Sequence, residues 1–325
     1  MPLAPTARLR SPRHYGPDAG AVILALALIV AWSAPADAIQ HGDLLVTDRA
    51  SRSLLIVNPV TGAQAVLSTG GFFSEPEAVV ANAAGRIFVV EADRFGAGSK
   101  IVEVNRITGA QSVLASGGII LDPNDIAIEA SGMLVVADFS GPSGAGGILR
   151  INPANGAKSV LLDGGAPFDL AVEADGQIVY ATFNFFNSLL IRFDTVAHSL
   201  TTLNSDVGGA GGVAVEPSGA ILVSDGGSAS DNASHVFRVD PVSGVRSTLT
   251  TGGPFAFKDL VVAADGSIYV VQETSILGVD PGTGAQHTVS SGGHFQSLGG
   301  IGIYDADSTT PTRTTTWGRL KHLYR

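Results

Sequence analysis

The chain has 325 residues and a formal net charge of −10, and it contains 41 glycines and no cysteine. A chain of this length can bury a large core without disulfides, and its acidic balance repels phosphate backbones, so nucleic acid is not an expected partner. Glycine-rich composition without sustained helical periodicity favours an all-β fold.

The first segment, residues 1–38, has the form of an export signal. Three arginines precede an apolar run over residues 21–32, and small residues at 36 and 38 resemble a signal-peptidase site. We expect cleavage after Ala38 and a secreted or periplasmic protein. The alternative is an uncleaved membrane anchor, because about 20 apolar residues span a bilayer. Pro35 and the short apolar run favour cleavage.

A turn motif then recurs at a spacing of about 44 residues, within the range of propeller blades. In most copies an Asn or Asp caps its own backbone, proline presets φ and glycine takes the left-handed position, which together form a hairpin turn. The fourth copy is degenerate. The six copies begin at Asn58, Asn105, Asn152, Asp194, Asp240 and Asp280.

Four short β-branched runs surround each turn and predict four strands, here lettered A to D from the central tunnel outward. The chain enters on a B strand at 44–48 and leaves on an A strand at 300–305. The last strand must then pair with the first, which closes a ring and removes its open edges. The sequence therefore predicts a monomeric six-bladed β-propeller over residues 39–308, with four antiparallel strands per blade.

Because the four strands of a blade run alternately up and down, the connections between them lie on two different faces of the ring. The D-to-A and B-to-C connections lie on one face, the loop face, and the Asx turns lie on the other, the turn face. Eleven of the 14 phenylalanines fall in or beside the loop-face connections. This skew predicts an apolar bowl that binds a ligand, although the same rings would also serve as plugs over the blade tops. The expected ligand contacts are Phe73, Phe168, Phe185, Phe186, Phe257 and Lys258.

Two columns of acids recur on the loop face. A carboxylate at a strand end commonly accepts backbone N–H bonds from the neighbouring blade, so a structural role explains repeated acids better than chemistry does. Alternation along strand A would turn its acids away from the tunnel unless the strand starts irregularly. The strand-B column contains Asp48, Glu91, Asp138 and Asp225, and the strand-A column contains Asp125, Asp169 and Asp259.

A third column, one residue before strand A, does not repeat and includes Glu77 and Asn124. The stretch Asp122-Pro-Asn-Asp, continuing to Asp138, resembles the blade motif of the gluconolactonase, senescence-marker-protein and paraoxonase group, and the whole array resembles NHL-type propellers. This resemblance implies Ca²⁺ at the tunnel mouth, held by Glu77, Asn124 and Asp169, with Asp125 or Asp259 activating water. Where the family has further ligands, this chain has Phe168, Gly211 and Lys258.

Other chemistry is weakly indicated. His235 and His294 lie on the loop face, and either is a candidate general base, with His294 the favoured one, but a lone loop histidine is otherwise simply solvated. A lyase resembling the streptogramin-opening propellers would need a tunnel-mouth histidine that the sequence does not place. The favoured function is non-catalytic binding of a small molecule or partner protein on the loop face. The alternative is a calcium-dependent lactonase or esterase.

The chain ends in a threonine-rich linker and a basic tail, residues 309–325. The tail carries four basic residues and no acid, whereas residues 39–308 carry 12 basic and 27 acidic residues. On a helix, Trp317, Leu320 and Tyr324 would share one face with cations opposite. That pattern suits an anionic surface, a sorting partner or the propeller's own acidic flank, and the alternative is an end with no role.

Overall fold

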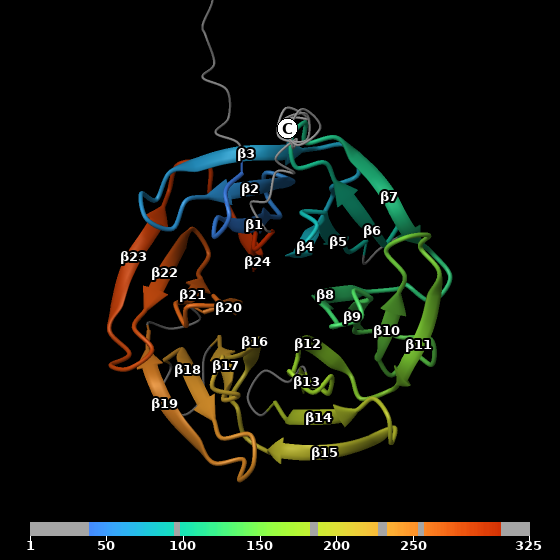
Figure 1. Ribbon diagram of the computed structural model, residues 1–325, viewed down its shortest axis with the longest axis vertical. Helices are drawn as coiled ribbons and strands as arrows, with labels where there is room; N and C mark the ends of the chain where they lie inside the picture. The colour runs from blue at the N-terminus through green and yellow to red at the C-terminus, as the bar shows by residue number, and fades with distance from the viewer. Residues whose placement is uncertain (1–38, 94–97, 183–187, 227–232, 253–256, 307–325) are drawn as a thin grey trace, which may run out of the picture. The chain divides into compact units, whose positions relative to one another are not determined.

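The computed structural model describes residues 39–93, 98–182, 188–226, 233–252 and 257–306, which form six four-stranded antiparallel sheets around a central tunnel (Figure 1). The predicted six-bladed β-propeller is therefore confirmed. The predicted signal peptide and the basic tail lie outside the described residues. No helix long and apolar enough to cross a membrane occurs in the part of the chain that the structure describes.

The blades are numbered from the N-terminus, and their strands are given from the tunnel outward. Blade 1 contains β24 (Leu298–Ile303), β1 (Leu44–Asp48), β2 (Ser53–Val57) and β3 (Gln64–Thr69). Blade 2 contains β4 (Pro76–Ala81), β5 (Ile87–Glu91), β6 (Lys100–Val104) and β7 (Gln111–Ser116). Blade 3 contains β8 (Pro123–Ile128), β9 (Leu134–Asp138), β10 (Gly147–Ile151) and β11 (Lys158–Asp163).

The remaining blades follow the same order. Blade 4 contains β12 (Pro167–Val172), β13 (Ile178–Thr182), β14 (Leu190–Asp194) and β15 (Ser199–Asn204). Blade 5 contains β16 (Ala210–Val215), β17 (Ile221–Asp225), β18 (His235–Val239) and β19 (Arg246–Thr251). Blade 6 contains β20 (Leu260–Val262), β21 (Ile268–Val271), β22 (Ser275–Val279) and β23 (Gln286–Ser291).

The ring closes through β24 and β1, as the sequence predicted. Leu44 pairs with Ile303 and Val46 with Ile301 in an antiparallel ladder, and the register shifts before Asp48. Residues more than 250 positions apart thus share one sheet, with β24 as its innermost strand (Figure 1). This pairing joins the two ends of the described chain within blade 1.

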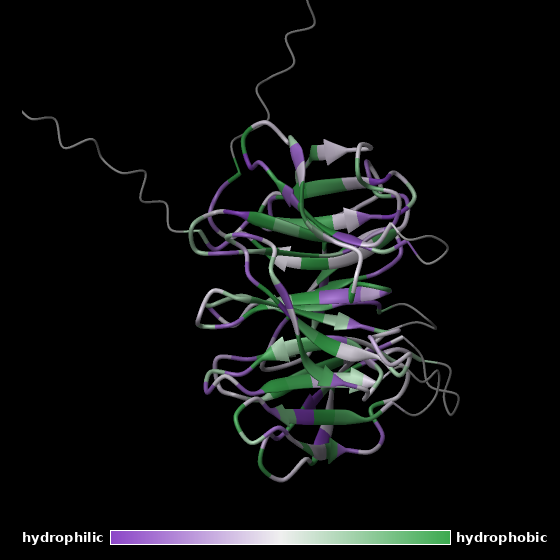
Figure 2. Ribbon diagram, turned by 90° about the vertical axis from the view of Figure 1, so that its right-hand side faces the viewer, coloured by the Kyte–Doolittle hydropathy of each residue, from purple (hydrophilic) through white to green (hydrophobic). Residues whose placement is uncertain are grey.

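The hydrophobic cores lie between blades rather than within them. Leu45 of β1 packs with residues of blade 2, whereas its neighbours Leu44 and Val46 pack with residues of blade 6. Alternate side chains of a strand point to opposite faces of its sheet, so each middle strand serves two cores. Figure 2 shows the resulting hydrophobic strand interiors, with more polar connections at both faces. No blade can bury its apolar side chains without both neighbours.

The outer strands are also linked around the ring. Gln111, the first residue of β7, donates from Nε2 to the Ser68 hydroxyl at 2.9 Å and to the Gly70 carbonyl at 3.0 Å, both near the end of β3. The first residue of an outer strand makes an equivalent backward contact in five blades, through Gln64, Gln111, Lys158, Arg246 and Gln286. Ser199 begins β15 in blade 4, and its side chain is too short for this reach.

The turn-face hairpins have the predicted Asx chemistry. Asn58 Oδ1 accepts the N–H groups of Val60 and Thr61 at 3.1 and 2.9 Å, and Gly62 has a φ of 71°. A Cβ on Gly62 would also lie 2.4 Å from the Val289 carbonyl oxygen of blade 6, so glycine serves both the turn and the packing. The degenerate fourth copy keeps the turn because Asp194 retains its cap and His198 adopts the left-handed conformation, with a φ of 52°.

Gly302 provides a test of the close approach at the ring closure. A Cβ there would lie 2.5 Å from the Val79 carbonyl oxygen of β4. Because overpacking costs about 1–3 kcal/mol, we expect Gly302→Ala to lower the free energy of unfolding by that amount in denaturant titrations. Gly282→Ala is the matched control, since its nearest neighbour, an Asp280 oxygen, is 3.5 Å away. Equal stability of Gly302→Ala and wild type would contradict this packing.

Candidate functional site

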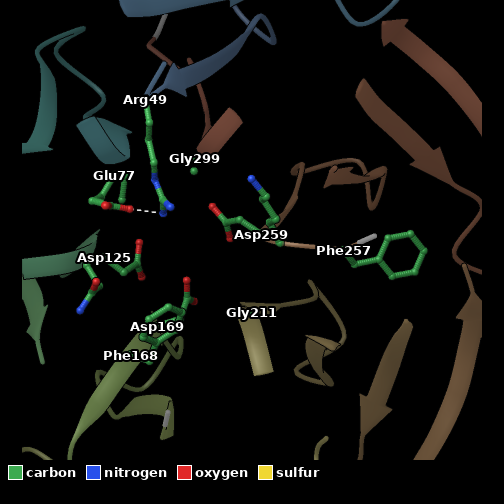
Figure 3. A pocket seen from close by; sticks show the side chains of 13 residues that line it. Arg49, Glu77, Asp125, Phe168, Asp169, Gly211, Phe257, Asp259 and Gly299 are labelled. Carbon is green, nitrogen blue, oxygen red and sulfur yellow. Dashed lines mark ion pairs between the residues drawn. The ribbon is translucent and has the colours of Figure 1, made fainter. Parts of the chain in front are cut away.

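The innermost strands enclose two cavities along the tunnel. The cavity at the loop-face mouth has a volume of about 230 Å³, and a second cavity of about 320 Å³ lies among the innermost strands. Both are lined by Asp125, Asp169 and Asp259, which therefore lie at the boundary between them. Figure 3 shows these three side chains around the tunnel centre.

Irregular strand starts turn these acids into the tunnel. The register of β8 against β9 shifts between Pro123 and Asp125, and that of β12 against β13 shifts between Pro167 and Asp169. In blade 6, the backbone of Val271 forms hydrogen bonds with two consecutive residues of the opposite strand start. Its carbonyl accepts from the Lys258 N–H at 2.9 Å, and its N–H donates to the Asp259 carbonyl at 2.8 Å. A β-bulge re-aims the side chain at which it occurs, so strict alternation does not apply at these positions.

Each tunnel aspartate links its blade to the next one. Asp125 Oδ2 accepts the Leu170 N–H at 3.0 Å, Asp169 Oδ1 accepts the Val213 N–H at 2.7 Å, and Asp259 Oδ2 accepts the Ile301 N–H at 2.8 Å. The donors belong to the innermost strands β12, β16 and β24. The predicted structural role of the strand-A acids is therefore confirmed, with bonds that cross from blade to blade as expected.

Two blades make this link with hydroxyl groups instead. In blade 1, Thr47 Oγ1 accepts the Gly300 N–H at 2.8 Å and donates to the Glu77 carbonyl of blade 2 at 2.9 Å. In blade 5, Ser224 Oγ accepts the Gly212 N–H at 2.8 Å and donates to the Lys258 carbonyl at 3.1 Å. Sequence reasoning missed both residues. The sequence did contain a signal for them. Thr47 and Ser224 belong to the two blades whose innermost strand has glycine at the position where other blades have aspartate.

Burial raises the pKa of all three tunnel aspartates. Desolvation raises the pKa of Asp125 to about 6, and desolvation with the charge of Asp125 raises the pKa of Asp259 to about 8. The pKa of Asp169 lies well above its usual range because of burial first and then the charges of Asp125 and Asp259. The backbone N–H bonds act in the opposite direction without cancelling this effect. With a pKa of about 8, the Asp259 carboxyl retains its proton at neutral pH.

Arg49 and Glu77 form an ion pair above this acidic ring (Figure 3). The Glu77 side chain is only 3% exposed, and the Arg49 side chain is 37% exposed and reaches into the cavity from the end of β1. The Arg49 Nε atom is buried without a hydrogen-bond partner. Sequence reasoning missed Arg49, since it lies just beyond the column of acids that end the second strands.

The other non-repeating residues lie around the same cavity. Lys258 Nζ is 2.5 Å from Glu273 Oε2 and donates to the Leu298 carbonyl at 3.0 Å. The Asn124 amide donates to the Asp122 carbonyl at 3.2 Å. Phe168 is half-buried and lines the cavity together with Gly211 and Gly299. The structure thus brings together the third sequence column at the tunnel mouth.

This donor set does not fit a calcium ion. The Glu77 carboxylate binds the Arg49 guanidinium, and the Asn124 amide nitrogen points a donor at Asp122. Calcium needs six to eight oxygen ligands. Within the described ranges, no group of three or more His, Asp or Glu residues is placed to hold a metal. The calcium site implied by the resemblance, with Glu77, Asn124 and Asp169 as ligands, is therefore not favoured.

The described loop-face phenylalanines include core plugs, one half-buried ring at the cavity, and the exposed Phe72 and Phe139. Phe73, Phe257 and Phe295 are at most 5% exposed and pack in the cores between blades. Figure 3 shows the Phe257 ring turned away from the tunnel centre, so neither Phe73 nor Phe257 offers its ring as a ligand contact. Phe168 lines the mouth cavity together with Phe257, whose ring packs in the core. Phe185 and Phe186 lie outside the described residues.

The acids that end the second strands fasten the loops entering their own blades. Asp138 accepts N–H groups of Leu121 and Asp122 at 2.8 and 3.1 Å, and Asp48 accepts those of Gln296 and Ser297 at 2.7 and 3.1 Å. The structural explanation is confirmed for these acids. The partners nevertheless belong to the connection that precedes the innermost strand, not to a neighbouring blade as the sequence suggested.

The histidines are separate from the tunnel mouth. His294 is exposed, and its backbone N–H donates to Gln64 Oε1 at 2.7 Å. His235 Nδ1 lies 3.3 Å from Asp225 Oδ2, and its ring stacks on Phe237 with centroids 5.1 Å apart. Among the described residues that line the mouth cavity, none is a histidine. The candidate base His294 is therefore not brought to the carboxylates.

Comparisons with known proteins support the fold. No family model matches the chain, and no curated protein matches it. The chain is 13% identical to a chain in the crystal structure of a nidogen/laminin complex, with a TM-score of 0.68 over 81% of this chain and 99% of that chain. It is also 13% identical to virginiamycin B lyase from Staphylococcus aureus, with a TM-score of 0.50 over 66% and 69% of the two chains. Likeness at this identity defines the class, a six-bladed β-propeller, and nothing finer.

The raised aspartate pKa values predict a pH-dependent stability. Unfolded aspartates ionise near their ordinary pKa, so between about pH 4 and pH 8 the native state binds more protons than the unfolded state. The free energy of unfolding should therefore fall as the pH rises through this window. Asp259→Asn should flatten that fall in denaturant titrations, whereas Asp163→Asn, at an exposed acid, should keep the wild-type slope. An unchanged slope in Asp259→Asn would contradict the assignment.

The Arg49–Glu77 pair can be tested by a double-mutant cycle. Arg49→Met leaves the buried Glu77 carboxylate without its guanidinium, which we expect to cost about 1–3 kcal/mol of unfolding free energy, less than for a fully buried pair because Arg49 is partly exposed. Glu77→Gln should recover part of this loss when added to Arg49→Met. Strictly additive effects of the two changes would show that the residues do not interact.

Proposed function

We propose that the chain is a non-catalytic propeller that binds a ligand or a partner protein at the tunnel mouth of its loop face. One observation carries this proposal: the mouth presents a different arrangement of side chains in almost every blade. Residues that repeat from blade to blade are explained by hydrogen bonds that stabilise the fold. A purely structural role at the mouth would not require a different side chain in each blade. The residues in the non-repeating positions are Glu77, Asn124, Phe168, Gly211, Lys258 and Gly299.

The dimensions of the mouth favour a small occupant. Its volume of about 230 Å³ is below the range of about 300–1,000 Å³ that is usual for drug-sized ligands. One side chain of a partner, or a small molecule, would fill it. Phe168 offers an apolar ring, and the partly exposed Arg49 guanidinium offers N–H donors at the same cavity. Recognition by an apolar surface with a few placed polar groups is typical of binding pockets.

The polar groups of the mouth are arranged for structure more than for turnover. Asp259 uses both carboxylate oxygens, accepting the Leu260 N–H at 2.6 Å and the Ile301 N–H at 2.8 Å. Glu77 is committed to Arg49. A general base must be free to reach the proton that it removes. The cavity lining within the described residues also contains no Ser, Thr, Tyr or His to act as a nucleophile or base.

A partner protein is consistent with the comparison to a chain of similar fold in the nidogen/laminin complex. Export is part of the same proposal, with cleavage after Ala38 delivering the propeller to the periplasm or the exterior. Stability there would come from the cores between blades and from the strand ladders, since the chain has no cysteine for disulfides.

Capture experiments test the binding proposal. Immobilised full-length chain should retain a ligand or protein from the producing cell's extract or medium, and Phe168→Ala with Lys258→Met should lose it while keeping the wild-type melting temperature. Val242→Ala is the matched control, because Val242 is 93% exposed on the turn face. Equal capture by the mouth variant, or loss of capture in the turn-face variant, would place binding elsewhere.

The calcium-dependent lactonase is tested with the same protein. Ligands that bind the native state raise the melting temperature, so we expect no shift with CaCl₂ at millimolar concentration. We likewise expect no metal-dependent turnover of lactones or aryl esters. Turnover that Glu77→Gln abolishes would overturn the non-catalytic proposal and restore the alternative.

A further inference from the structure

A groove on the turn face offers a second interaction surface, independent of the tunnel mouth. It has a volume of about 610 Å³ and lies across blades 4, 5 and 6. Val172, Val215 and Val262, from β12, β16 and β20, are half-buried and form its apolar floor. The same three valines and Asp305 also line the inner tunnel cavity, so the groove continues into the tunnel.

The rim of this groove carries excess negative charge. Glu173 and Glu216 are neutralised by Arg192 and Arg238, with N–O distances of 2.5 and 2.6 Å. Asp175 and Asp305 are exposed, and neither has an ion-pair partner among the residues that the structure describes. An apolar floor with exposed carboxylates at its edge suits an occupant that is both basic and apolar.

The chain itself carries such a segment, and it leaves the propeller at this place. The innermost strand β24 ends at Ile303, and Asp305, two residues later, lines the groove. Residues 309–325 include Arg313, Arg319, Lys321 and Arg325 but no acid, together with Trp317, Leu320 and Tyr324. Since an extended chain covers about 3.3–3.6 Å per residue, a few residues after Asp305 are enough to bring this segment over the groove.

We propose that residues 309–325 dock in the turn-face groove, with their cations at Asp175 and Asp305 and their apolar side chains on the valine floor. Charge complementarity and the exit point of the chain select this occupant over an unrelated partner. The groove lies on the turn face, whereas the mouth cavity opens on the loop face. Binding at the loop face and docking at the turn face therefore succeed or fail separately.

Trp317 provides the measurement, because the chain has two tryptophans and Trp32→Phe leaves Trp317 as the only one. In the full-length Trp32→Phe protein at low ionic strength, we expect Trp317 emission to lie to the blue of that of a synthetic peptide of residues 309–325. The shift should be independent of protein concentration. Adding Asp175→Asn and Asp305→Asn should remove it, since asparagine can keep the bond from the Gln177 N–H to residue 175 but not the charge. Asp163→Asn is the matched control and should keep the shift.

Four results would overturn the proposal. Emission equal to that of the free peptide would show that the segment does not dock. A shift that persists in the Asp175→Asn, Asp305→Asn variant, with an unchanged melting temperature, would place docking elsewhere. A shift that grows with protein concentration would assign the segment to a second copy. A shift that appears only with phosphatidylglycerol vesicles would assign it to a membrane surface.

Discussion

Pairing of β24 with β1 is the constraint on which the rest of the structure depends. Side chains of each middle strand alternate between two cores, so every blade needs a neighbour on both sides to bury them. A row of blades would leave two apolar faces open at its ends. When the last strand completes the first blade, the two ends become one sheet and all six cores are covered.

The same closure creates an electrostatic problem at the tunnel. Innermost strands approach one another closely, and five of the six blade junctions within the described residues use a tunnel-side Asp, Ser or Thr to bond the next blade's backbone. Three of these groups are carboxylates in one confined space, where burial and mutual repulsion raise their pKa values. Retained protons lessen the repulsion. Residues just above this ring share no such bond to the next blade, and their side chains differ from blade to blade.

The sequence predicted the architecture well because its signals are local. A turn such as Asn58 to Gly62 depends on caps and left-handed glycines within five residues, and a cut in the repeat is enough to imply the β24–β1 pairing. Side-chain direction was harder to predict. Whether Asp125 faces the tunnel depends on a bulge, and whether Phe73 plugs a core depends on how its loop folds. Arg49 was missed because only the assembled ring places it beside Glu77.

Hydrogen exchange of the closing strands is the most direct test of this account. If closure is required for every core, backbone amides of residues 44–48 and 298–303 should exchange only through global unfolding, with protection equal to that of buried strands such as β9 and β17. Exchange of β24 through a local opening, at a free energy well below that of global unfolding, would show that the ring does not depend on this strand.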